Sequence, residues 1–422
     1  MKEQLYAKLN LRIIASEFKE IRLQKGYSLR GIADAANLSH VIISDFENGR
    51  NYPNLETLVL LFKQLDIDFC IDTVLLTSYK NTIDLLYEAI YYKYPDQVKK
   101  QCEVLMKAEP ILKNSLLEID YQLARLTFAI SVKNAIDFEK IHALERYYDF
   151  FSEKQKQVFN LITGAAYFKK EKIEKAIDYL KRNMTIYGVH KAHALTLSYL
   201  ANSYIKLFHH TNALYYAKEA SSFHGENASF VRKISSDLTL AKLYIEIAQY
   251  QEAQKIISSI ELTIEGEEHP TLYQEMWFLK AYIEYRKGNY KLALKQYQNR
   301  HFNVVYSHLF EAFIFVQMKQ IDEAVKRLEK GLSKEYVIKD FVYSRMYRIA
   351  LAHFNGIYED QHTEEWCLEL LNVPQRLPDF HHYRFVFESL LKYYETQEDF
   401  EKAYKLAKEY IRRTGKTLLF EK

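Results

Sequence analysis

Glycine and histidine residues are the first candidates for chemistry in this chain of 422 residues. Gly26 and Gly31 have the spacing of a phosphate-binding loop, but Ile32-Ala33 follow where that loop requires Lys and then Ser or Thr. Neighbouring histidines lack acidic or thiol residues at the spacing of a metal site: they are His190 and His193, His209-His210, and His381-His382. The motifs G-x-S-x-G, H-E-x-x-H and C-x-x-C do not occur in the sequence. We therefore expect no catalytic residue, no metal and no cofactor, and a protein that is not an enzyme.

The segment Phe18–Asp68 has the spacing of several short, capped helices, with apolar residues at helical intervals. Ser28 and Ser39 are suited to begin the second and third helices, because a serine hydroxyl accepts a hydrogen bond from a free backbone N–H in the first turn. The third helix, His40–Phe46, is short and is expected to end at Gly49. A short helix after a tight turn is the geometry that enters the DNA major groove with its N-terminus first.

This segment resembles the XRE family of repressor-type helix-turn-helix domains. The matching residues are Arg22, Lys25-Gly26, Ser28, Ile32-Ala33, Ser39, Ile43-Ser44, Glu47-Asn48-Gly49, Pro53 and Leu55. The resemblance implies that base edges are read by His40, Val41, Ser44 and Asp45. It implies phosphate contacts from Arg30, Ser39, Asn48 and Arg50. By the same positions, Ile43 and Phe46 are interpreted as core residues.

Two residues depart from the family pattern, and the charge of the segment is unusual. Leu29 stands where the family often has a polar glutamine, and Asp45 is acidic on the face that would read bases. Asp45 could accept a hydrogen bond from a cytosine amine, but it would repel nearby phosphates. The segment Leu11–Asp72 carries seven Lys/Arg and nine Asp/Glu, a net charge of −2. One copy should therefore bind DNA weakly, and we expect a homodimer or higher oligomer on an inverted-repeat operator.

Composition places the rest of the chain in the all-helical class. The sequence has only 11 Gly and 6 Pro, the residues that break helices. Its 35 Tyr and 25 Phe suit many small packed interfaces better than one core. No apolar run has the length of a membrane span, the N-terminus lacks a secretory signal, and three cysteines lie far apart. We expect a cytoplasmic protein that does not contact a membrane.

Self-similarity begins after the helix-turn-helix segment, at periods of roughly 31 to 40 residues. A small residue is followed by another after twelve positions, and by an aliphatic or aromatic residue four later. The triplets are Gly164/Ala176/Leu180, Ala201/Ala213/Ala217, Ala241/Ala253/Ile257, Ala281/Ala293/Tyr297, Ala312/Ala324/Leu328 and a weaker Leu391/Ala403/Ala407. This pattern resembles the tetratricopeptide repeat, in which stacked helix pairs form a right-handed superhelix. We expect three regions: DNA binding at 1–70, a linker helix and divergent repeats at 71–142, and regulatory, dimer-forming repeats at 143–422.

The first helix of each repeat should line a concave face. Positions expected there are Ser198, Asn202, Ser235, Lys242, Tyr282, Tyr285, Tyr306 and Phe313. An asparagine can both donate to and accept from a peptide backbone, a tyrosine offers a rigid ring with a polar tip, and Lys242 could meet a carboxylate. Each of these side chains could instead have an ordinary packing or solvent-exposed role.

The order of an XRE-type domain and a tetratricopeptide array resembles the RRNPP peptide-pheromone receptors of Gram-positive bacteria and their phages. The resemblance implies a quorum-sensing transcription regulator whose repeats bind a short signalling peptide and whose homodimer then changes its arrangement on double-stranded DNA. The alternative is a helix-turn-helix regulator or adaptor whose repeats bind a protein. The basic segment Lys402–Lys416 suits the solvated face of a last helix or a further DNA contact.

Overall fold

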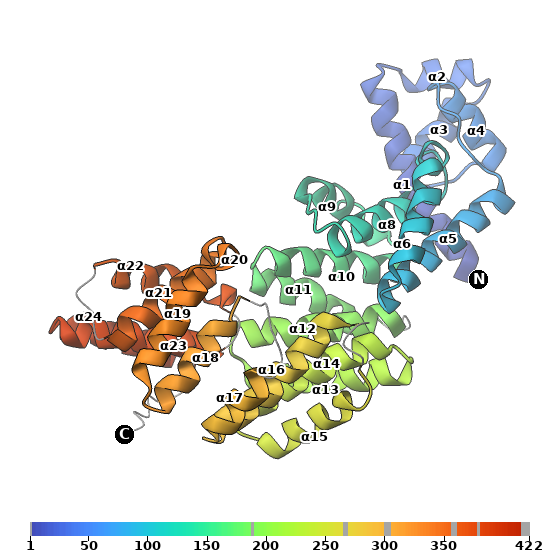
Figure 1. Ribbon diagram of the computed structural model, residues 1–422. Coiled ribbons are helices and arrows are strands. Elements are labelled where there is room, and N and C mark those ends of the chain that lie inside the picture. Colours follow the sequence, from blue (N-terminus) through green and yellow to red (C-terminus); the bar gives the residue numbers. More distant parts are fainter. Residues whose placement is uncertain are drawn as a thin grey trace. The chain divides into compact units, whose positions relative to one another are not determined.

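The computed structural model describes residues 2–186, 190–264, 269–298, 305–355, 361–377 and 380–414. Within these ranges the elements are 24 α-helices and two short 3-10 helices (Figure 1), besides one isolated bridge between Cys70 and Ser115. The chain divides into two compact units, Met1–Tyr199 (unit 1) and Leu200–Lys422 (unit 2). The predicted all-α class is confirmed for the described residues.

Unit 1 begins with the four helices α1 (Lys2–Gln24), α2 (Leu29–Ala35), α3 (His40–Glu47) and α4 (Leu55–Lys63). Their core is centred on Phe18, whose ring centroid lies 5.6 Å from that of Phe46 and 5.3 Å from that of Phe62. These rings come from three different helices, so their contact fixes α1, α3 and α4 against one another.

Helix α1 also takes part in a second core of unit 1. Ile13 packs in the cluster that contains Ile119 of α8 (Glu118–Ser131) and Phe159 of α10 (Glu153–Lys169). The Asn10 side-chain amide donates to the Leu116 carbonyl at 3.1 Å and accepts from the Gln155 amide at 3.3 Å. One continuous helix is thus held at Asn10 and Ile13 by repeat-like helices and at Phe18 by the DNA-binding segment. The expected boundaries after residues 70 and 142 stay predictions.

The other elements of unit 1 are α5 (Thr73–Tyr92), α6 (Pro95–Lys107), α7 (Glu109–Leu112), α9 (Phe138–Glu145), η1 (Tyr148–Phe150) and α11 (Ile173–Met184). Helix α12 (His190–Lys206) crosses into unit 2. Unit 2 continues with α13 (His210–Glu226), α14 (Phe230–Glu246), α15 (Tyr250–Glu261), α16 (Pro270–Arg286), α17 (Tyr290–Gln298), α18 (Ser307–Gln317) and α19 (Ile321–Leu332). It ends with α20 (Glu335–Ile338), α21 (Phe341–Asn355), α22 (Gln361–Leu371), η2 (Pro374–Arg376), α23 (Phe380–Thr396) and α24 (Phe400–Thr414).

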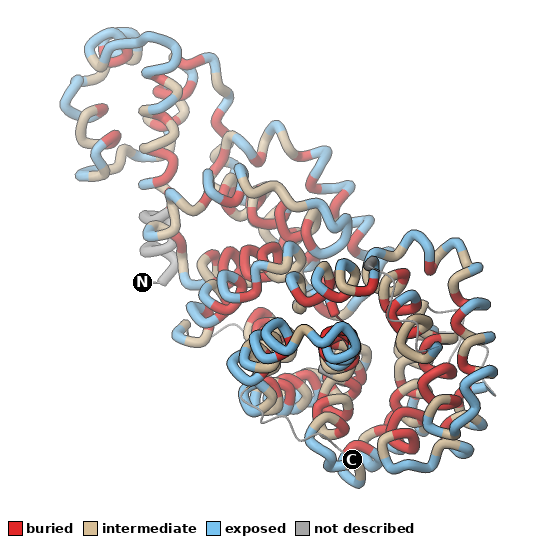
Figure 2. The backbone as a smooth tube through the Cα atoms, turned by 90° about the vertical axis from the view of Figure 1, so that its left-hand side faces the viewer, coloured by how far each residue is buried: buried red, intermediate tan, exposed pale blue. Residues whose placement is uncertain are grey.

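The small residues of the predicted triplets lie where the two helices of a hairpin pack. A Cβ atom added to Gly164 on α10 would lie 2.6 Å from Leu180 Cγ on α11, so no larger residue fits there without a shift. Ala281 and Ala293, and likewise Ala312 and Ala324, are fully buried. Buried positions follow the facing sides of the paired helices along the backbone (Figure 2). The predicted helix pairs are therefore confirmed.

The turn between the two helices of a pair has a regular conformation that the sequence analysis did not predict. Seven positions after the first residue of each triplet, the backbone adopts a positive φ: Glu171, Phe208, Ala248, Gly288, Lys319 and Glu398. Only Gly288 (φ 84°) is the residue type that favours this conformation. The repeats therefore form with few glycines, because other residues accept the strained position in the turn.

Candidate nucleic-acid interface and ligand site

The two serine caps of the DNA-binding segment are formed as predicted. The Gly31 N–H donates to Ser28 Oγ at 2.9 Å, and the Val41 N–H donates to Ser39 Oγ at 3.3 Å. Between the helices, Asn37 adopts a positive φ of 54°, which asparagine tolerates better than most residues. The caps and this turn together set the direction of α3.

The residues assigned to DNA contact lie mainly on an exposed face. Arg30, Ser39, His40, Val41, Asn48 and Arg50 are exposed, whereas Ser44 and Asp45 are half-buried. Ile42, which the sequence analysis did not assign to DNA contact, is 40% exposed on the same helix. Ile43 and Phe46 are fully buried, which confirms their interpretation as core residues. Whether the exposed residues contact DNA stays a prediction.

Asp45 forms an ion pair with Arg50, which reduces its expected repulsion of phosphates. Arg50 Nη1 lies 3.4 Å from Asp45 Oδ1, and Arg50 was itself assigned to a phosphate. Nearby, the Asn48 side-chain amide donates to the Ser44 carbonyl at 2.7 Å and so closes the end of α3. On the exposed face of α3, the charge of Asp45 is therefore partly balanced by Arg50, and the Arg50 charge is partly balanced in turn.

A buried ion pair clamps α3 to α1. The Arg22 guanidinium donates from Nη2 to Glu47 Oε2 at 2.8 Å and from Nη1 to the Tyr27 carbonyl at 2.6 Å. The hydrogen bond to Glu47 raises the pKa of Arg22 above its ordinary value. The sequence analysis placed both residues in the family pattern but did not pair them, since they lie 25 positions apart.

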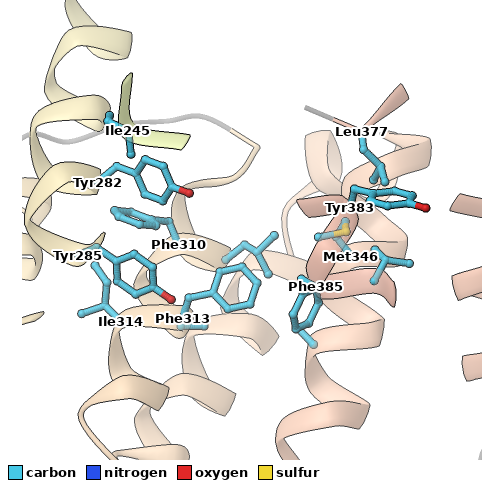
Figure 3. Close-up of a cluster of buried hydrophobic side chains, with 14 of the residues drawn as sticks. Ile245, Tyr282, Tyr285, Phe310, Phe313, Ile314, Met346, Leu377, Tyr383 and Phe385 are labelled. Carbon is cyan, nitrogen blue, oxygen red and sulfur yellow. The ribbon is translucent and has the colours of Figure 1, made fainter. Parts of the chain in front are cut away.

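Four of the eight residues expected on the concave face meet in unit 2. Tyr282 and Tyr285 on α16, Phe313 on α18 and Tyr306 at the start of α18 form an aromatic cluster with Phe278, Phe310 and Phe385. Figure 3 labels Tyr282, Tyr285, Phe310, Phe313 and Phe385 of this cluster. The rings of Phe313 and Phe385 are 4.8 Å apart, so α18 and α23 touch through side chains more than 70 residues apart in sequence.

His381 of α23 completes this aromatic cluster. Its ring centroid lies 5.9 Å from Tyr282, 6.2 Å from Tyr285 and 6.0 Å from Phe313. The cavity among these side chains measures only about 20 Å³, room for roughly one water molecule. Its lining residues are Phe278, Tyr282, Tyr306, Leu309, Phe310, Phe313, His381 and His382. In this arrangement the cluster is filled by the chain's own side chains.

Burial keeps two phenols of the aromatic cluster, Tyr285 and Tyr306, neutral. Burial raises the pKa of Tyr285 to about 12 and that of Tyr306 to about 12. The Arg286 guanidinium donates to the Tyr282 hydroxyl at 3.2 Å. The cluster therefore offers apolar ring faces, neutral hydroxyls and two imidazoles.

The other four predicted positions lie elsewhere. Ser198 on α12 donates to the Ala194 carbonyl of its own helix at 3.1 Å. Asn202 on the same helix, and Ser235 and Lys242 on α14, are half-buried and do not line the cavity of the aromatic cluster. His381 and His382 were considered only as a metal pair, and among the described residues no group of His, Cys, Asp and Glu has the geometry of a metal site. The triplet Leu391/Ala403/Ala407 makes α23 the first helix of the last pair. Applied to α23, the repeat pattern would have placed His381 and His382 on a helix that lines the concave face.

Comparison with known proteins identifies the first segment. The family described as Helix-turn-helix matches residues 18–71. This stretch of the chain is a helix-turn-helix domain. It contains both serine caps, the Arg22–Glu47 pair and all eight residues assigned to DNA. No curated protein matches the sequence, and none of the described helices is both long and apolar enough to cross a membrane.

Solved structures share the repeat fold at low sequence identity. The apo form of the quorum sensor NprR from B. thuringiensis has a TM-score of 0.61 and 18% identity, covering 80% of this chain and 99% of that one. A Rap protein complexed with Competence and Sporulation Factor has a TM-score of 0.65 and 15% identity, covering 80% and 98%. Aspartyl phosphate phosphatase F from Bacillus subtilis has a TM-score of 0.50 and 15% identity, covering 84% and 98%. The predicted resemblance in architecture is confirmed: a helix-turn-helix domain precedes helical repeats of the NprR and Rap fold.

Proposed function

We propose that the protein is a cytoplasmic transcription regulator, without catalytic activity, whose helix-turn-helix domain binds an inverted-repeat operator as a homodimer. The observation that carries this proposal is α3, a capped helix with its His40–Val41 end exposed in a domain of matching family. Six of the eight assigned DNA contacts are exposed, and none of the eight is fully buried. The net charge of −2 over Leu11–Asp72 favours two copies over one.

The test of DNA binding uses sequences selected by the full-length chain from a random duplex library. Arg50→Ala should weaken binding to all sequences and flatten the salt dependence, because it removes a phosphate contact. His40→Ala should change the preferred base at one position of each half-site. Equal losses on every sequence for both variants would contradict the division of roles.

For the repeats we propose a short linear peptide as ligand, bound at the aromatic cluster. In support, NprR and Rap share this fold, and the Rap structure contains the factor named with it. The aromatic cluster offers ring faces and neutral hydroxyls but no carboxylate in its lining, which suits an apolar or aromatic peptide side chain. Because the cavity holds only about 20 Å³, the peptide must displace His381 or its neighbours, so the closed and the bound arrangement differ.

The test of peptide binding uses synthetic peptides encoded by short reading frames beside the gene, each with a signal segment. One of them should raise the melting temperature of the wild-type chain, and His381→Ala should strengthen its binding by opening the aromatic cluster. A protein-binding adaptor is the second candidate, favoured by how completely the cluster is filled. It would be supported if no such peptide binds either variant while the selected DNA is still bound.

A further inference from the structure

Two glutamates face each other where the helix-turn-helix domain meets the first helices that follow it. Glu17 lies on α1 and Glu118 begins α8, and their carboxyl groups are hydrogen-bonded to each other. Glu20 lies one turn further along α1. Both partners are half-buried. The contact therefore joins the DNA-binding end of unit 1 to its second part through two groups that ordinarily carry the same charge.

No basic side chain neutralises these carboxyl groups among the described residues. Lys113, which lines the same space, is 2.5 Å from Glu109 on α7. Arg146 donates from Nε to the Ala143 carbonyl at 3.4 Å. The polar neighbour of Glu118 is Gln122, whose amide donates to it at 3.0 Å. A hydrogen bond between two carboxyl groups then requires one of them to keep its proton.

The remaining groups around the pair also disfavour two negative charges. Burial raises the pKa of Glu17 to about 10, and the hydrogen bond with Glu118 and the charges of Glu118 and Glu20 act in the same direction. Tyr147, which follows α9, has a pKa raised to about 12, chiefly by burial. The phenol therefore stays neutral, although the charge of Arg146 acts on its pKa in the opposite direction.

A cavity of about 370 Å³ adjoins the pair and reaches both sides of the junction. It is lined on α1 by Ile14, Glu17, Glu20, Ile21 and Gln24, and on the other elements by residues that include Phe62, Phe69, Asn114, Glu118 and Tyr147. A space of this size admits water, so the shared proton can exchange with solvent without unfolding of the unit.

We propose that Glu17 and Glu118 form a proton-dependent latch that holds α1 against α8 and thereby orients the helix-turn-helix domain. With one shared proton the carboxyl groups attract each other; without it two carboxylates repel across the junction and the contact opens. The latch is independent of the proposed peptide ligand, since both glutamates belong to unit 1 and the aromatic cluster belongs to unit 2.

The direction of the pH effect follows from the proton count. In the closed junction the pair keeps a proton that ordinary glutamates, with a pKa of 4.5, release. Closing therefore takes up a proton, and the closed state loses stability as pH rises from the ordinary glutamate value toward the raised one. The equilibrium constant for opening should rise by up to tenfold per pH unit in this window.

The experiment is native-state hydrogen exchange of the full-length chain between pH 6 and pH 9, with protection of α1 and α8 amides corrected for intrinsic rates. In the wild type, protection should fall as pH rises. In Glu17→Gln and in Glu118→Gln it should stay high, because a glutamine amide donates to the remaining carboxylate at every pH. Glu103→Gln, which removes an exposed carboxylate on α6, is the matched control and should keep the wild-type dependence.

Two results would overturn the latch: pH-independent protection in the wild type, or a dependence that persists in both glutamine variants. If either variant misfolds, Glu20→Gln keeps the pair intact and removes one neighbouring charge. Because the Glu20 charge raises the pKa of Glu17, its removal should lower that pKa, and the fall in protection should level off at a lower pH. An unchanged midpoint in Glu20→Gln would count against the electrostatic origin.

Discussion

The face of α3 and the aromatic cluster of unit 2 are built in opposite ways. The residues assigned to DNA come from Arg30–Arg50 and are mostly exposed. The aromatic cluster joins Phe278 to Phe385, more than 100 residues apart, and buries its side chains against one another. A surface that reads a large, rigid polymer needs exposed groups on a short scaffold. The peptide site that we propose needs enclosure, which these distant parts of the chain supply together.

The largest expected effect is a loss of stability in the helix-turn-helix domain that leaves unit 2 unchanged. Arg22→Ala leaves Glu47 as an unpaired buried carboxylate and should lower the free energy of unfolding of the helix-turn-helix domain by about 4 kcal/mol. The side chains of Arg22 and Glu47 are only 6% and 2% exposed, so water cannot replace the lost partner. Hydrogen exchange of α2–α4 would report the loss, with unit 2 unchanged. Arg30→Ala, an exposed arginine on α2, is the control, and an equal loss there would refute the role of burial.

A substitution at a tightly packed glycine should destabilise unit 2 in the same selective way. A Cβ atom added at Gly331 on α19 would lie 2.2 Å from Cε1 of the buried Tyr347 on α21. Gly331→Ala should therefore cost about 2 kcal/mol of stability through overpacking, measured by urea denaturation. At Gly225 the nearest atom is 3.4 Å away, on the flexible Lys233 side chain. Gly225→Ala should be neutral or slightly stabilising, and similar losses for both variants would contradict the packing argument.

Asp45 lies on the α3 face for which we propose DNA contact. Asp45→Asn releases Arg50 from its pair and removes a negative charge near phosphates, so binding to random duplex DNA should strengthen by about 1 kcal/mol or less. Fluorescence anisotropy at two salt concentrations would measure this gain and its salt dependence, with Glu139→Gln on α9 as a distant control. A loss restricted to sequences with one particular base would instead show that Asp45 reads that base.

The smallest expected effect concerns the turns that shape the repeats. Lys319 is exposed and has a φ of 60°, so Lys319→Gly should stabilise unit 2 by about 0.5 to 1 kcal/mol. Lys330 is exposed within α19. Lys330→Gly should lower the stability of unit 2 by roughly 1 kcal/mol, because glycine is unfavourable inside a helix. Thermal unfolding of both variants tests this pair of signs. A loss in Lys319→Gly would mean that the lysine side chain stabilises the turn.

Local order could be predicted from the sequence, because its causes are local. Ser28 and Ser39 cap helices within three residues of themselves, and Gly164 and Ala176 meet through one short hairpin. The helix pair α21–α22 was missed, although Ala350, Thr363 and Cys367 are buried at nearly the same spacing as the other triplets. Threonine and cysteine are not typical of those positions, and the interval from Ala350 to Thr363 is one residue longer.

The aromatic cluster could be predicted only in part. Tyr282, Tyr285 and Phe313 follow from the repeat register, but their contact with His381 depends on how α16, α18 and α23 pack within unit 2. That packing is the sum of many small angles between neighbouring helices, and no single residue type encodes it. The carboxyl pair at Glu17 and Glu118 escaped notice for the same reason, since 100 positions separate its members.

The second half of helix α1 acts as a rigid arm that carries the helix-turn-helix domain. Ile13 is fixed in the core of the following helices, and about eleven residues further on Gln24 ends the helix inside the domain. At 1.5 Å per residue this arm is roughly 17 Å long, so a tilt of about 10° at its base moves the far end by about 3 Å. A displacement of that size is comparable to the rise between successive base pairs. Small adjustments around Ile13 would therefore be enough to bring α3 into or out of register with the major groove that we propose it reads.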